Sequence, residues 1–172
     1  MKELFRMLEG DLSTVKNKIV RNSSRAIIIK NGKIAMVYSK LYNYYKFPGG
    51  GIEKGESKID ALVREVREEA GLIVKKVTIK EFGSVYREYL SPDDDNTMYF
   101  QDNYYYLCDV EDEIVDQNLD EYEDIEGFSL FWVNPYDAIN ANRPFEHGPK
   151  SRSMIEREAK VLELLINQKY FD

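Results

Sequence analysis

The feature that most constrains this chain is a run of three glycines, Gly49 to Gly51, shortly before a strongly amphipathic segment. No regular element tolerates three consecutive glycines well, so we expect a loop whose backbone can approach a ligand closely. Downstream, Ser57 followed by Asp60 predicts a helix start with an N-cap and an acid in the first turn. Gly71 follows where a left-handed residue is needed to end the helix. The chain is therefore expected to fold around a glycine loop that leads into one helix.

The predicted helix has two unlike faces. Its apolar residues recur at helical spacing and form one stripe: Ile59, Leu62, Val63, Val66 and Ala70. Glu65, Glu68 and Glu69 lie at i, i+3 and i+4, so three carboxylates share the opposite face. Like charges at this spacing destabilise a helix by roughly 0.2–0.5 kcal/mol per pair. Replacing Glu69 by glutamine should therefore leave folding intact or slightly favour it.

Two explanations of this acidic face are possible. The first is a solvated surface laced with salt bridges, in which Arg64 offsets part of the repulsion. The second is a site for a hard divalent cation such as Mg²⁺, which takes oxygen ligands and binds through a few carboxylates plus substrate phosphates. The adjacent glycines favour the second explanation, because they let backbone carbonyls and amides approach a ligand.

Residues Gly50 to Leu72 read GGIEKGESKIDALVREVREEAGL. This segment resembles the Nudix box, G-x5-E-x7-R-E-U-x-E-E-x-G-U, in which U is a bulky apolar residue. The positions that match are Gly50, Glu56, Arg64, Glu65, Val66, Glu68, Glu69, Gly71 and Leu72. The preceding Phe47-Pro48-Gly49 also resembles the lead-in that is common in this family.

The resemblance implies a fold and an activity. The fold is an α/β/α sandwich with a mixed central sheet. The activity is a pyrophosphohydrolase that cleaves a nucleoside diphosphate linked to another moiety, with Mg²⁺ or Mn²⁺ as cofactor. Candidate substrates are nucleoside triphosphates, sugar nucleotides and dinucleoside polyphosphates. The alternative is a non-catalytic Nudix module that binds and senses a nucleotide, although such a module has no need to keep every hydrolytic acid.

The resemblance also assigns roles to single residues. The implied metal ligands are the carboxylates of Glu65, Glu68 and Glu69 and the backbone carbonyl of Gly49. Arg64 would orient these carboxylates, and Glu56 would hold the loop–helix junction by pairing with Arg64. The structural positions of the box are Gly50, Glu56 and Gly71. The general base would be a box glutamate, with Glu65 the first choice, or a separate acid downstream.

The downstream acid is sought in an acidic segment. Residues 109–126 contain ten Asp and Glu and no Lys or Arg. The simplest interpretation is a solvated loop, mobile until substrate and metal arrive. In Nudix enzymes the extra acid often precedes the last strand, and Glu121, Glu123 and Glu126 all precede the strand expected at 128–133. Glu123 is the favoured base and Glu121 the next.

The remaining elements follow from local patterns. Asn31-Gly32 predicts a two-residue hairpin turn between strands at 25–30 and 33–39. Further strands are expected at 72–80, 83–90, 97–108 and 128–133, and helices at 2–9, after Asn134-Pro135 and at 151–168. No linker divides the chain, so residues 1–22 form an N-terminal helix and lead-in that belong to the same unit as a Nudix domain at 23–172.

Composition narrows the class of partner. The net charge of −7 disfavours nucleic acid, and no apolar stretch approaches the roughly 18 residues that span a bilayer. Cys108 is the single cysteine, so an internal disulfide is excluded. We expect a cytoplasmic protein that binds a small nucleotide. Tyr45 is a candidate for contact with a nucleobase and Lys40 for contact with a phosphate, and a homodimer is possible.

Overall fold

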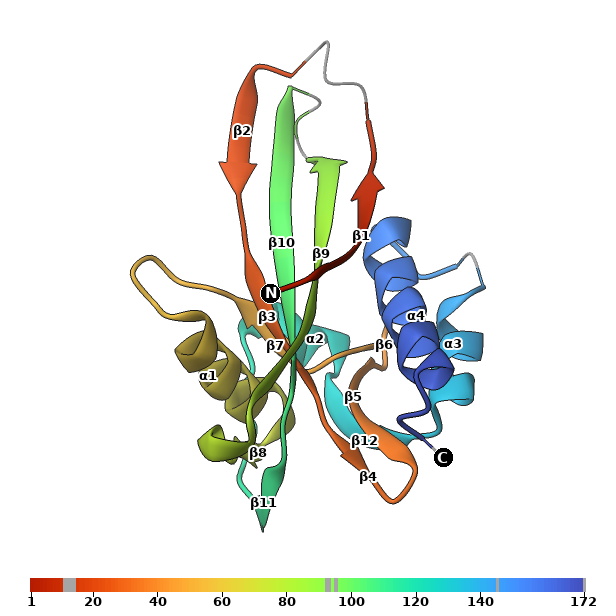
Figure 1. The fold of residues 1–172 in the computed structure, drawn as a ribbon. Coiled ribbons are helices and arrows are strands. Elements are labelled where there is room, and N and C mark those ends of the chain that lie inside the picture. Colours follow the sequence, from red (N-terminus) through yellow and green to blue (C-terminus); the bar gives the residue numbers. More distant parts are fainter. Residues whose placement is uncertain (11–14, 92–93, 95, 145, 172) are drawn as a thin grey trace.

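The structure, a computed structural model, describes residues 1–10, 15–91, 94, 96–144 and 146–171. Strands form the centre of a mixed α/β fold, and helices lie on two sides of them (Figure 1). Helix α1 (Lys58–Ala70) flanks one side, and α3 (Pro135–Asn142) and α4 (Arg152–Asn167) flank the other. The predicted α/β/α arrangement with a mixed sheet is confirmed.

The largest sheet contains both parallel and antiparallel pairs. Its order is β1 (Glu3–Leu8), β9 (Lys80–Leu90), β10 (Thr97–Leu107), β3 (Ser23–Ile27) and β7 (Gly49–Gly51), and β2 (Asn17–Val20) also pairs with β10. Strands β9 and β10 are antiparallel, whereas β1 runs parallel to β9 and both β2 and β3 run parallel to β10. The three glycines form strand β7 rather than the expected loop, because they pair with β3.

A second sheet and a short strand pair complete the strands. The second sheet contains β12 (Ser129–Val133), β5 (Lys33–Ser39) and β4 (Ile29–Lys30), with β6 (Tyr44–Lys46) paired to β5. Strand β8 (Leu72–Val74) pairs with β11 (Val110–Ile114). The predicted hairpin turn is confirmed, because Asn31 and Gly32 have φ values of 54° and 70° between antiparallel β4 and β5.

Helix α1 has the ends that the sequence predicts. Ser57 has an extended backbone, and its Oγ accepts the N–H of Asp60 at 3.0 Å. Gly71 has a φ of 65° and donates its N–H to the carbonyl of Arg67. A β-carbon at this position would also collide with the carbonyl of Val115. Glycine is therefore required both for the backbone angle and for the space.

Two clusters of buried apolar side chains hold the layers together. Leu62 of α1 belongs to one cluster, and Leu162 of α4 belongs to the other. Neighbouring residues of β10 point into different clusters, with Tyr106 in the first and Tyr105 in the second. The central strands are thus buried on both faces, and this fixes α1 on one side of the sheet.

The helix expected over residues 2–9 is wrong. Glu3–Leu8 form β1, which pairs with the edge of β9. Leu4 lies over Gly83, where any side chain would collide with it. A helix of eight residues gains little on its own, so hydrogen bonds to the free edge of β9 decide the outcome. The N-terminal residues therefore add strands to the large sheet.

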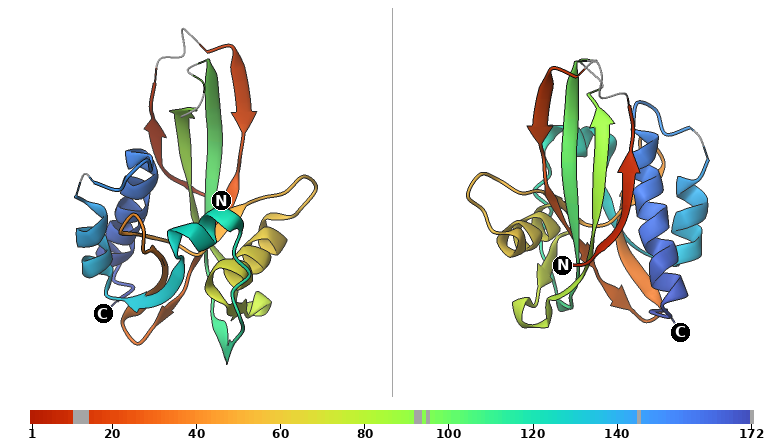
Figure 2. Two further views of the ribbon diagram at one scale, coloured as in Figure 1. Left: turned by 180° about the vertical axis from the view of Figure 1, so that it is seen from behind. Right: turned by 45° about the horizontal axis from the view of Figure 1, so that its top comes forward.

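The loop expected over residues 109–126 is also wrong in part. This segment contains β11 and a short helix, α2 (Glu121–Glu126), and seen from behind α2 lies between α1 and the β5–β6 strands (Figure 2). Glu123 and Glu126 are only 5% and 4% exposed. Their carboxylates accept hydrogen bonds from the protein, so mutual repulsion in solvent does not decide the conformation of this part.

Candidate active site

The site is built at the junction of β7 and α1. Gly49 has a φ of 135°, and a β-carbon there would collide with the carbonyl of Ser24 in β3. The Oγ of Ser24 donates a hydrogen bond to the carbonyl of Lys58 at 2.7 Å. Strand β3 thus holds both the glycine strand and the first residue of α1, and the junction has little freedom to shift.

Gly50 makes room for a carboxylate. A β-carbon at this position would overlap the Glu65 carboxylate, which lies directly against the backbone of β7. Burial raises the pKa of Glu65, and the hydrogen bond from Arg64 lowers it in part. The glycine called structural from the sequence is therefore the position that lets Glu65 approach the strand.

Arg64 joins the loop to the acidic face of α1. Its Nε and Nη2 donate to the two oxygens of Glu56 at 2.8 and 2.9 Å, and Nη2 also donates to the carbonyl of Gly51 at 3.0 Å. Its Nη1 donates to Glu65 at 2.7 Å and to Glu68 at 3.1 Å. The guanidinium lowers the pKa of Glu56, so this ion pair is held at neutral pH.

We expect Glu56→Gln to lower stability and activity together. The substitution replaces a bidentate hydrogen bond between charged groups by a neutral one, which should cost about 1.5–3 kcal/mol of unfolding free energy. Thermal denaturation and turnover, measured side by side, test this. Glu53→Gln, an exposed neighbour, is the matched control. An unchanged melting temperature with lost turnover would instead assign Glu56 to the chemistry.

Glu69 is the most deeply buried acid of the box. It is 1% exposed, and its Oε1 forms an ion pair with the ammonium of Lys46. Its Oε2 accepts the N–H of Gly49 at 3.0 Å. Burial raises the pKa of Glu69 to about 7, although Lys46 and Arg25 lower it, and the charge of Glu123 raises it further. Glu123 therefore lies within electrostatic reach of the box.

Arg25 of β3 is a further cation beside the box. Its Nη1 donates to the carbonyl of Gly49 at 2.6 Å and to that of Phe47 at 3.3 Å. Its buried Nε has no hydrogen-bond partner among the described residues. The positive charge lowers the pKa of both Glu65 and Glu69. Sequence reasoning missed Arg25, although a lone cation at the start of an apolar strand was a usable signal.

The donor atoms suit a hard divalent cation. The candidate ligands, all oxygen donors at one junction, are the carboxylates of Glu65, Glu68 and Glu69 and the carbonyl of Gly49. Within the described part of the chain, however, no three acidic, histidine or cysteine side chains converge on one point. Instead, Arg64 contacts Glu65 and Glu68, and Lys46 contacts Glu69. The residues fit a metal ion provided that Arg64 and Lys46 move away from these carboxylates when it binds.

Glu123 is held in place by its own helix. Its Oε2 accepts the N–H of Asp120 at 3.0 Å in a capping box, and its Oε1 accepts the hydroxyl of Tyr122 at 2.9 Å. These two hydrogen bonds fix the orientation of the carboxylate. The charge of Glu123 is among those that act on Glu69.

Gln117 and Asn118 of the acidic segment form hydrogen bonds to the last turn of α1, and the sequence did not predict these contacts. The side-chain amide of Gln117 donates to the carbonyl of Glu69, and also to that of Phe128 at 3.3 Å. The N–H of Asn118 donates to the carbonyl of Glu68 at 2.9 Å. These bonds satisfy carbonyls in the last turn of α1, which have no partner inside the helix. The start of α2 is therefore set relative to the box glutamates.

The other two downstream acids are placed differently. Glu121 is exposed at the start of α2. Glu126 is buried, and its Oε2 accepts hydrogen bonds from Ser39 at 3.0 Å and Tyr44 at 3.1 Å. Its Oε1 forms an ion pair with Lys150. Glu126 thus anchors α2 to the second sheet.

Tyr45 and Lys40 are not brought to the glutamates. Side chains alternate along β6, so Tyr45 points away from the side of Lys46. Its ring packs against Tyr38, with centroids 4.7 Å apart, and near Phe131. Lys40 is exposed beside Gly127, at the end of α2.

Cys108 is buried, and its burial raises the pKa of the thiol to about 12. The thiol is therefore neutral at physiological pH and poorly nucleophilic. A disulfide-forming reagent should label the native protein on the order of 10³-fold more slowly than the urea-unfolded chain. Rapid labelling of the folded protein would contradict this placement. His147 is also buried, with its ring nitrogens 3.0 Å from the carbonyls of Tyr42 and Asn142.

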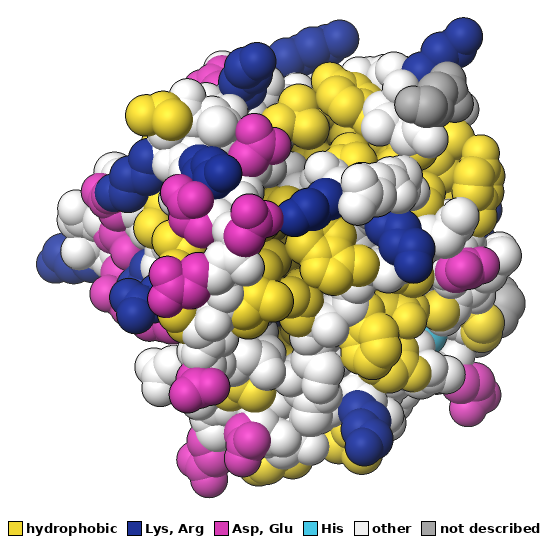
Figure 3. All heavy atoms as spheres, turned by 90° about the horizontal axis from the view of Figure 1, so that it is seen from below, with side chains coloured by type: hydrophobic (Ala, Val, Ile, Leu, Met, Phe, Trp, Pro, Cys, Tyr) yellow, Lys and Arg dark blue, Asp and Glu magenta, His cyan; other side chains and the backbone are white. Residues whose placement is uncertain are grey.

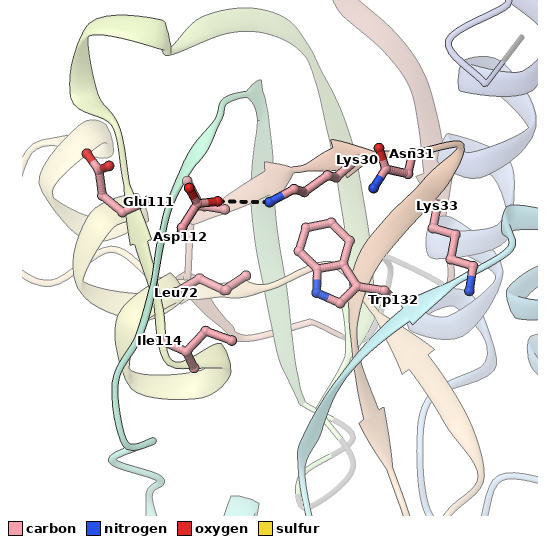
Figure 4. A pocket seen from close by; sticks show the side chains of 9 residues that line it. Lys30, Asn31, Lys33, Leu72, Glu111, Asp112, Ile114 and Trp132 are labelled. Carbon is pink, nitrogen blue, oxygen red and sulfur yellow. Dashed lines mark hydrogen bonds and ion pairs between the residues drawn. The ribbon is translucent and has the colours of Figure 1, made fainter.

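A separate hollow of about 350 Å³ lies between the β8–β11 pair and the second sheet (Figure 4). Lys30, Asp112 and Trp132 line it, and Lys30 donates to Asp112 at 3.0 Å. Seen from below, this end of the molecule mixes hydrophobic side chains with charges of both signs (Figure 3). None of the candidate site residues described above lines the hollow.

Comparisons with known proteins agree with this geometry. The NUDIX domain model matches residues 20–157. The 8-oxo-dGTP diphosphatase of Buchnera aphidicola is 37% identical over 78 residues, which are 45% of this chain and 55% of that protein. The RNA pyrophosphohydrolase of Actinobacillus succinogenes is 37% identical over 68 residues, 38% of this chain and 34% of that protein. The chain thus spans about half, or less, of the length of these curated relatives.

Solved structures show the same fold. A MutT structure, from work on the Aliivibrio salmonicida and Vibrio cholerae proteins, has a TM-score of 0.55 at 23% identity and covers 87% of this chain and 99% of its own. A NUDIX hydrolase from Nitrosomonas europaea has a TM-score of 0.55 at 23% identity and covers 80% of this chain and 87% of its own. No described helix is long and apolar enough to cross a membrane.

Fold and site together define an α/β/α protein that carries three glutamates on the helix after a glycine strand. Within that class, the chain belongs to the NUDIX domain family.

Proposed function

We propose that this chain is a hydrolase that uses a divalent metal ion to cleave a pyrophosphate bond in a nucleoside diphosphate linked to another moiety. The observation that carries the proposal is the complete box with Glu65, Glu68 and Glu69 on the face of α1 beside β7. The relatives named as a diphosphatase and a pyrophosphohydrolase support it.

Different residues of the site have different proposed roles in the reaction. Glu65, Glu68, Glu69 and the carbonyl of Gly49 would hold Mg²⁺ or Mn²⁺. When bound there, the ion neutralises phosphate charge and lowers the pKa of a bound water. Arg64 orients the acids because it contacts two of them.

Glu123 is the proposed general base. It takes a proton from the attacking water while the water oxygen bonds to phosphorus and the bridging P–O bond breaks. The electrons of that bond leave with the departing phosphate. The charge of Glu123 acts on Glu69, which supports a position beside the proposed metal site. Glu65 is the alternative base, because it also lies at the β7 junction.

A nucleotide panel tests the proposed activity. With Mg²⁺ or Mn²⁺, we expect release of phosphate or pyrophosphate from at least one nucleoside triphosphate, sugar nucleotide or dinucleoside polyphosphate. Chelation of the metal by EDTA should abolish this release. The net charge of −7 favours small nucleotides over RNA, whose phosphates a cationic surface would attract. Binding of a nucleotide without any turnover would support a sensing module instead.

A further inference from the structure

The ion pair between Lys46 and Glu69 has a consequence for metal binding. Lys46 is only 9% exposed, and lysine is rarely so buried without a partner. Its ammonium contacts Oε1 of Glu69 and lies 4.8 Å from the centroid of the Phe128 ring. The positive charge of Lys46 also lowers the pKa of Glu65. Glu69 thus has a buried side-chain ammonium as its ion-pair partner.

The strand fixes Lys46 in this position. Tyr44 and Lys46 point to the same side of β6, and their polar ends contact the buried acids Glu126 and Glu69. Asn142 holds the strand between them, because its side chain accepts the N–H of Tyr45 at 2.7 Å and donates to its carbonyl at 2.8 Å. The ion pair therefore does not depend on a flexible surface side chain.

We propose that Lys46 is an internal counter-ion that occupies Glu69 until a divalent metal ion replaces it. The proposal rests on the metal-ligand role proposed for Glu69. A metal ion and an ammonium group repel one another strongly at one carboxylate oxygen, so the two partners exclude each other. The ring of Phe128 offers the displaced ammonium a second partner through its π face. Metal binding thus leaves a cation free at the site, where a substrate phosphate can attract it.

Titration calorimetry without nucleotide tests the exchange. Lys46→Met removes the competing charge and keeps a side chain of similar length. At an alkaline pH, where Glu69 stays ionised without Lys46, Mg²⁺ and Mn²⁺ should bind about tenfold more tightly than to the wild type. Lys46→Arg keeps the charge and should bind these ions much as the wild type does. Lys76→Met is the matched control. Lys76 pairs with Asp60, an exposed acid of α1, the helix that also contains Glu69. The metal affinity of this control should not change.

A second measurement uses the wild-type protein, so it does not depend on the variant folding. Acetylation by acetic anhydride, followed by mass spectrometry, should modify Lys46 faster when Mg²⁺ is present, whereas modification of Lys76 should be unaffected. Lys46 that stays equally protected with metal, or a Lys46→Met affinity that is unchanged or weaker, would overturn the proposal. If the wild type binds neither ion, the proposed metal-dependent function fails as well.

Discussion

Replacing Glu123 by glutamine is expected to reduce turnover by about 10²–10⁴-fold and to leave nucleotide affinity nearly unchanged. The amide oxygen of glutamine can still accept the N–H of Asp120, and its NH2 group can donate to the hydroxyl oxygen of Tyr122, so α2 should remain folded. Only the capacity to take a proton from water is lost. Steady-state kinetics, with circular dichroism as a check on folding, measure the split between kcat and KM.

Two neighbouring acids provide the controls. Glu121→Gln alters an exposed carboxylate and should retain turnover. Glu126→Gln removes the charge that pairs with Lys150, so it should lower the melting temperature before it affects the chemistry. Near-native turnover in all three variants, and in the triple variant, would transfer the role of base to Glu65.

Glu69→Gln is expected to abolish tight metal binding and to destabilise the protein by about 3–5 kcal/mol, because it leaves the buried ammonium of Lys46 without a counter-charge. The sequence alone predicts a slight gain in stability instead, because the substitution relieves repulsion worth only roughly 0.2–0.5 kcal/mol per pair. Burial decides between the two. Urea unfolding and metal titration measure both effects.

Glu68→Gln is the matched control for stability. The Glu68 side chain is 35% exposed and bonds to Arg64 at 3.1 Å, so its loss should cost less than about 1 kcal/mol. A Glu69→Gln protein as stable as the Glu68→Gln protein would contradict the buried ion pair. Unchanged metal affinity in Glu69→Gln would contradict its proposed role as a ligand.

Local sequence was enough to predict the elements whose ends depend on backbone angles. The caps at Ser57 and Gly71 and the turn at Asn31-Gly32 each require a particular residue type, and all three are confirmed. Strand β1 was not predictable in this way. Its hydrogen bonds come from β9, and its packing depends on Gly83, about eighty residues away in the sequence.

The acids of the site were easier to predict than their partners. Glu65, Glu68 and Glu69 share one turn of a helix, so spacing alone puts them on one face. Lys46 lies 23 positions from Glu69, and only the folded chain brings the two side chains together. For the same reason the sequence could not show that Glu126 anchors α2 or that Gln117 reaches the carbonyl of Glu69.

Strand β6 has only three residues, yet it contacts acids of two different helices. Tyr44 bonds to Glu126 of α2, and Lys46 pairs with Glu69 of α1. The helix with the proposed base and the helix with the proposed metal ligands are therefore linked through the side chains of one short strand. Loops that make no contact with these two helices can change length or composition without altering the distance between them. Substrate preference in such a chain can diversify while the geometry of hydrolysis is inherited unchanged.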